Sequence, residues 1–61
     1  NVRVNAVLPS ILDTAANRAD MPSEDFSRWV KAEELCAVIE FLLSDAASAV
    51  TGASIPVTAK V

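Results

Sequence analysis

Few side chains in this 61-residue sequence are suited to covalent or acid–base chemistry. There is no histidine, which excludes the serine–histidine and cysteine–histidine pairs that activate a nucleophile, and with them the usual zinc ligand sets. The remaining candidates are a hydroxyl, a thiol and a group of carboxylates: Ser10, Cys36, Asp13, Asp20, Glu24 and Asp25. The hydroxyl and the thiol are candidate nucleophiles, and the carboxylates are candidate ligands of a hard cation.

Each candidate also has a simpler structural interpretation. Ser10 lacks a base to activate it, so we expect an ordinary turn serine. Cys36 lies within an apolar segment, where a buried small side chain is expected. The carboxylates are spaced too irregularly for a known cation-binding loop, so we expect them to lie on the solvated surface and predict no metal site.

The composition argues against some classes of partner and indicates the cellular compartment. The net charge is −3 and the five basic residues are scattered singly, whereas nucleic-acid binding needs a clustered basic patch. The longest apolar run is far shorter than the roughly 20 residues that span a bilayer, and no signal peptide is apparent. A single cysteine allows no internal disulfide. We therefore expect a cytoplasmic protein without nucleic-acid or membrane partners.

The hydrophobic pattern predicts an α/β chain with one βαβ unit. Alternating residues favour a strand over 2–8, followed by an irregular loop over 9–30 with one short helix near Ser23, in which Phe26 and Trp29 face inward. A helix is predicted over 32–44, a small-residue connection over 45–52 and a second strand over 53–58. The two strands should be parallel, and Pro9 should end the pairing of the first.

The predicted helix has more apolar surface than one strand pair can cover. One stripe is formed by residues at helical spacing: Leu35, Val38, Ile39 and Leu42. Other apolar residues lie off that stripe: Cys36, Ala37, Phe41 and Leu43. Because 52% of so short a chain is hydrophobic, we expect a homo-oligomer formed through helix 32–44 and the last strand, or pairing with an upstream part of the fold.

Two stretches resemble the C-terminal part of the short-chain dehydrogenase/reductase family. The first is RVNAVLPSILDT (3–14), similar to the family pattern N-x-x-x-P-G-x-x-x-T, and the second is SDAASAVTGASIPVTAK (44–60), similar to S-(D/E)-x-(A/S)-x-x-(I/V)-T-G before a last strand. An amphipathic helix separates them, as in the family. The resemblance covers essentially the whole chain and keeps the order of several separate signals.

The resemblance implies the last two strands of a Rossmann-type, doubly wound sheet and a nicotinamide cofactor, NAD or NADP. The cofactor-binding residues it implies are Pro9, Ser10, Leu12 and Thr14. The backbone of Leu12 would meet the carboxamide, and the Thr14 hydroxyl would lie near the carboxamide or the pyrophosphate. Residues 17–29 would fall in the loop that covers substrate, where Phe26 and Trp29 are either lid aromatics or core.

Three positions depart from the family pattern. Ser10 stands where glycine is usual, which restricts the backbone of the turn. Ala59 and Lys60 replace the usual closing glycines. Lys31 and Ala32 stand where a capping Thr or Ser and a Pro often open the helix, so a weak N-terminal cap is expected.

The family's glycine-rich phosphate turn, its Tyr-x-x-x-Lys pair and its catalytic serine belong upstream of these residues, and the first residue is not Met. We therefore predict a C-terminal fragment of an NAD(P)-dependent oxidoreductase that has no catalytic residues, binds no cofactor by itself and is inactive alone. The alternative is a non-enzymatic, self-associating module derived from that fold. Whether the isolated chain is an enzyme stays open.

Overall fold

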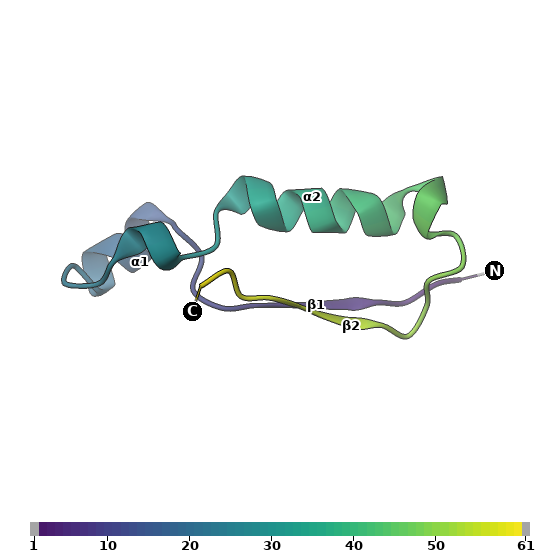
Figure 1. Cartoon of the computed structure of the whole chain (residues 1–61), viewed down its shortest axis with the longest axis horizontal. Coiled ribbons are helices and arrows are strands. Elements are labelled where there is room, and N and C mark those ends of the chain that lie inside the picture. Colours follow the sequence, from purple (N-terminus) through teal and green to yellow (C-terminus); the bar gives the residue numbers. More distant parts are fainter. Residues whose placement is uncertain (1, 61) are drawn as a thin grey trace.

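A computed structural model describes residues 2–60 of the chain. Its elements follow in this order: strand β1 (Ala6–Pro9), helix α1 (Ala15–Asp20), 3-10 helix η1 (Phe26–Arg28), helix α2 (Ala32–Leu43), 3-10 helix η2 (Asp45–Ala47) and strand β2 (Ser54–Val57). Figure 1 shows α2 lying along the strand pair, with α1 beyond one end of it. The predicted α/β class and single βαβ unit are confirmed.

The two strands are parallel, from Ala6 opposite Ser54 to Pro9 opposite Val57. As predicted, Pro9 is the last paired residue of β1, and it takes part in the ladder itself. The Ser10 N–H donates to the Val57 carbonyl at 3.2 Å, and donors alternate along a strand, so the nitrogen of Pro9 faces the free edge of β1. A missing N–H on that edge removes no bond from the ladder.

Both strands are shorter than the predicted ranges 2–8 and 53–58. Before β1 the chain is joined to the connection by side chains rather than by a ladder. The Asn5 amide donates to the Val50 carbonyl at 3.1 Å and accepts from the Ala53 N–H at 2.9 Å. Gly52 has a φ of 72° and donates to the Val4 carbonyl, so a tight left-handed turn leads into β2.

Helix α2 ends one residue before the predicted limit and has the weak start expected from its sequence. Lys31 provides no capping side-chain oxygen, but the Glu34 carboxylate accepts from the Lys31 N–H at 2.9 Å. At the other end the Ser44 hydroxyl donates to the Phe41 carbonyl at 2.6 Å. Leu42 is the one residue of α2 that is buried.

The loop predicted over 9–30 contains a helix that the sequence pattern did not indicate. Thr14 caps α1 by accepting from the Asn17 N–H at 3.1 Å. Because α1 buries none of its residues, it has no apolar periodicity to detect. The short helix predicted near Ser23 is instead a 3-10 turn over 26–28, capped by Asp25.

The core among residues 2–60 is small and divided. Trp29 and Val30 are buried before α2, while Leu42 and Ala47 are buried near its far end. A 12-residue helix is about 18 Å long, so these pairs form separate clusters. Cys36, predicted to be buried, is exposed, because no part of the described chain covers its side of α2.

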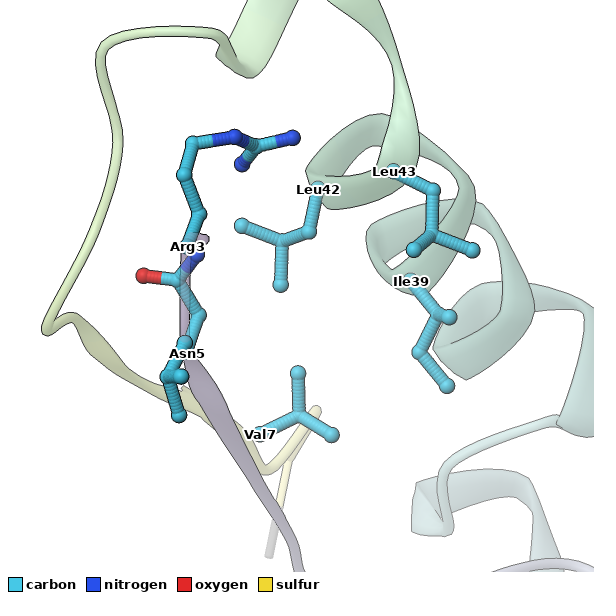
Figure 2. Close-up of a pocket in the computed structure, with 7 residues that line it drawn as sticks. Arg3, Asn5, Val7, Ile39, Leu42 and Leu43 are labelled. Carbon is cyan, nitrogen blue, oxygen red and sulfur yellow. The ribbon is translucent and has the colours of Figure 1, made fainter. Parts of the chain in front are cut away.

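A cavity of about 310 Å³ lies between β1 and the C-terminal half of α2. Figure 2 shows Val7 of β1 facing Ile39 and Leu42 of α2 across this space. The helix therefore covers the strand pair incompletely. No helix within residues 2–60 has the length and apolar character needed to cross a membrane.

Candidate functional site

The turn that follows β1 lies at the carboxyl edge of the sheet. The register brings Pro9 and Val57 opposite each other, so both parallel strands end at this edge. α1 lies beyond the same end in Figure 1. In open α/β sheets, ligands bind in the crevice outside the carboxyl ends of the strands. The turn over 10–14 is therefore the candidate site.

Ser10 is a structural residue of this turn. Its hydroxyl donates to the Thr58 carbonyl at 3.1 Å, which ties the turn to the end of β2. Its φ is not positive, so this turn does not require the conformational freedom of glycine at position 10. Ala59, where the family closes with glycine, does adopt a positive φ of 50°. The departure from the family pattern therefore strains position 59 rather than position 10.

The backbone around Leu12 is bridged to Val30. The Val30 N–H donates to the Ile11 carbonyl at 2.9 Å, and the Asp13 N–H donates to the Val30 carbonyl at 2.8 Å. In extended backbone, the N–H and C=O of Leu12 then point away from Val30. Its carbonyl accepts from Asn17 Nδ2 at 2.8 Å. No hydrogen-bond partner for the Leu12 N–H is found among residues 2–60.

The Thr14 hydroxyl accepts a hydrogen bond from α1 but donates none within the described residues. Its hydroxyl oxygen accepts from the Asn17 N–H, which leaves the O–H proton available. The Leu12 N–H and the Thr14 hydroxyl are thus two donors only two residues apart at the carboxyl edge. A ligand with a carbonyl or anionic oxygen is the chemical complement of this pair.

An ion pair fixes α1 against the turn. The Arg18 guanidinium donates from Nε to Asp13 Oδ1 at 2.6 Å and from Nη2 to Oδ2 at 2.9 Å. These hydrogen bonds lower the pKa of the Asp13 carboxyl and raise that of Arg18. The Arg18 guanidinium also lies 4.5 Å from the centre of the Phe26 ring. Arg18 thereby connects the turn to η1.

The aromatic pair belongs to the core. The Phe26 and Trp29 rings are 4.8 Å apart at 58°, and the Trp29 side chain is buried. Of the two alternatives open from the sequence, the structure of the described residues favours core packing.

The carboxylates do not form a metal site. Asp13 pairs with Arg18, and Asp25 accepts from the Ser27 N–H and hydroxyl, which lowers the pKa of Asp25. No cluster of three or more potential metal ligands occurs within residues 2–60.

Sequence patterns singled out Leu12 and Thr14, and the structure brings these two together with Asn17. They did not single out Asn17, whose amide bonds the Leu12 carbonyl five residues earlier. Asn5 is the asparagine that begins the family pattern, and its amide bonds Val50 and Ala53 far along the chain. The one available signal for Asn17 was its place three residues after Thr14, a residue type that often caps a helix.

A parallel βαβ unit with hydrogen-bond donors at the carboxyl edge is the arrangement of doubly wound, nucleotide-binding α/β proteins. A family model described as "Enoyl-(Acyl carrier protein) reductase" matches residues 1–59. The chain belongs to the short-chain dehydrogenase/reductase family.

A curated relative supports this membership. The chain is 38% identical to 3-oxoacyl-(acyl-carrier-protein) reductase FabG of Pseudomonas aeruginosa over 65 residues, an alignment that covers 92% of this chain and 26% of FabG. The chain thus spans about a quarter of the length of that reductase. No solved structure gives a significant match.

The described residues fit one end of a nicotinamide cofactor. A nicotinamide carboxamide would offer a carbonyl oxygen to the Leu12 N–H, and its polar atoms would suit the Thr14 hydroxyl. The phosphates have no counterpart here, because the sequence holds one glycine and no glycine-rich loop.

Proposed function

We propose that this chain supplies the nicotinamide side of an NAD(P)-dependent short-chain reductase. The observation that carries the proposal is the Leu12 N–H, which is without a partner among residues 2–60 on a bridged backbone at the carboxyl edge. The chain's own residues bind and orient the carboxamide through this N–H and the Thr14 hydroxyl. When bound, the cofactor supplies a hydride to a carbonyl group or takes one from an alcohol.

Ser10 and Pro9 shape the turn in this proposal, while residues 15–29 form the wall on the substrate side. The family description and the FabG relative both name acyl carrier proteins, so the proposed substrate class is an acyl thioester with a carbonyl or enoyl group. The lone cysteine supports a reducing, cytoplasmic setting.

The chain alone is not expected to catalyse hydride transfer. A positioned tyrosine or histidine acid and a phosphate-binding loop are needed, and the sequence has no tyrosine and no histidine. We expect no oxidation of NADH or NADPH by the 61-residue protein.

The test is a chimera in which these 61 residues replace the matching quarter of P. aeruginosa FabG. If the segment supplies the nicotinamide side, the chimera should oxidise NADH or NADPH when given a 3-oxoacyl thioester. Intact FabG and the isolated chain are the positive and negative controls. A chimera that folds but neither binds nor oxidises either cofactor would contradict the proposal.

The alternative, a self-associating module without activity, rests on one observation. Large apolar side chains are exposed on both layers of the described chain: Val2, Val4, Leu8, Ile39, Phe41 and Leu43. Burying these side chains against a second copy would stabilise the folded chain, and so would burying them against the rest of a reductase. Cofactor binding by the chimera separates this alternative from the enzyme.

A further inference from the structure

Helix α1 is held to the turn by polar contacts rather than by burial. None of its residues is buried, and five of its six residues are exposed. Asn17 is the exception, because it is half-buried. A six-residue helix is too short to be stable by itself in water. The contacts of Asn17 therefore help to hold α1 against the turn over 10–14.

Asn17 forms hydrogen bonds in two directions. Its backbone N–H donates to the Thr14 hydroxyl oxygen at 3.1 Å, and its carbonyl accepts from the Met21 N–H at 2.9 Å. Its side-chain nitrogen reaches back to the Leu12 carbonyl at 2.8 Å. The same residue thus touches both donor-bearing residues of the candidate site.

The Leu12–Asp13 peptide is held at both ends. Asn17 Nδ2 binds its carbonyl, and the Val30 carbonyl accepts from its N–H at 2.8 Å. A peptide unit is planar, so two bonds on opposite sides fix its rotation. Rotation of this plane changes the ψ of Leu12 and shifts the adjoining plane that carries the Leu12 N–H. Without Asn17, the Leu12–Asp13 peptide would keep one of these two bonds, from the Asp13 N–H to the Val30 carbonyl.

We propose that Asn17 is a positioning residue that orients the Leu12 backbone for the carboxamide of the cofactor. This inference rests on the proposed function. Asn17 acts through Leu12 and Thr14 rather than on the reacting atoms. Its role differs from that of Arg18, which fixes α1 through the Asp13 side chain and makes no bond to the Leu12 carbonyl.

The test uses the FabG chimera with two substitutions at this position. Asn17→Asp keeps the shape but lacks the side-chain donor, and Asn17→Leu lacks the donor without adding charge. Loss of one oriented hydrogen bond should raise KM for NADH or NADPH about three- to tenfold. Arg18→Met is the comparison variant, since it removes the neighbouring contact of α1 without touching the Leu12 carbonyl, and it should raise this KM less than either Asn17 variant.

Hydrogen exchange gives a readout that does not depend on turnover. Backbone exchange in the segment over 10–14 should become about tenfold faster in both Asn17 variants and should change less in Arg18→Met. Equal KM and equal exchange in wild-type and Asn17 variants would overturn the positioning role. Equal effects of Asn17→Leu and Arg18→Met would overturn it as well, because both would then act by loosening α1.

The two proposals fail in different ways. A wild-type chimera that binds neither cofactor contradicts the proposed function. In that case hydrogen exchange over 10–14 still tests whether Asn17 holds the Leu12 backbone. An active chimera whose Asn17 variants match the wild type contradicts only the role of Asn17.

Discussion

At the scale of single residues, the site depends on which polar atoms are already bonded within the chain. The Ser10 hydroxyl donates to the Thr58 carbonyl, so its side chain is anchored to the end of β2. Thr14 uses its oxygen as a helix cap and retains its proton. The family resemblance implied both Ser10 and Thr14 as cofactor-binding residues, whereas the hydrogen bonds leave Thr14 as the better donor.

The Arg18–Asp13 pair predicts a pH dependence. Hydrogen bonds from Arg18 lower the pKa of Asp13, and the charge of Lys31 contributes. A carboxyl whose pKa is depressed in the folded state stabilises that state above the pKa of unfolded aspartate, about 3.9, and this contribution is lost as pH falls through the lower, folded value. Arg18→Met should therefore raise the pKa of Asp13 and reduce the loss of stability on acidification.

Carboxyl titration by NMR measures the first effect, and urea unfolding between pH 3 and pH 6 measures the second. Arg28→Met is the control, because Arg28 donates to the Lys60 carbonyl rather than to Asp13. An Asp13 pKa that is the same in wild type and Arg18→Met would rule out the pair as its cause.

At the scale of elements, one buried residue joins the segment before α2 to the turn after β1. Val30 is fully buried, and its backbone bonds Ile11 and Asp13 on the other side of the bridge. Two separate parts of the predicted loop thereby become a single unit. The sequence pattern could not show this, because a bridge of one residue pair has no periodicity.

Val30→Ala should destabilise the folded chain by about 1–3 kcal/mol, since it removes buried methyl groups and leaves a cavity. Val2→Ala makes the same chemical change at a side chain that is 86% exposed, and should cost less than about 0.5 kcal/mol. Urea denaturation followed by Trp29 fluorescence compares the two. Similar losses in both variants would show that Val30 is not part of a core.

At the scale of the whole molecule, the chain is elongated. Its radius of gyration is 13.8 Å and its extents are 45 × 17 × 16 Å, whereas a compact domain of this length has a radius of gyration of about 10.5 Å. Among residues 2–60, four residues form the buried core, although half of the sequence is hydrophobic. The shape and the exposed apolar faces support the proposal that a second protein surface covers α2.

Phe41→Glu tests this proposal. Phe41 is 48% exposed on α2, and a carboxylate there would be costly to bury against another surface. If the isolated chain self-associates through α2, native mass spectrometry should find an oligomer in the wild type and a folded or unfolded monomer in the variant. Glu40→Gln, the neighbouring polar change, should preserve the oligomer. A wild-type monomer, or an oligomer that survives Phe41→Glu, would contradict self-association through α2.

The sequence by itself determined the family, the α/β class, the order of the two strands and the position of α2. These features are carried by local motifs and by periodic burial, which a linear pattern records. It also singled out Leu12 and Thr14, through their place in a recognisable motif.

Only the tertiary structure decided the rest. It revealed α1, the edge-facing nitrogen of Pro9, the exposure of Cys36 and the contact from Asn17 to Leu12. Each depends on which atoms meet across the fold: a helix without a buried face has no hydrophobic pattern, and a side-chain amide can bond any nearby backbone carbonyl. Hydrogen-bond partners are set by three-dimensional proximity, and neither composition nor spacing encodes that proximity directly.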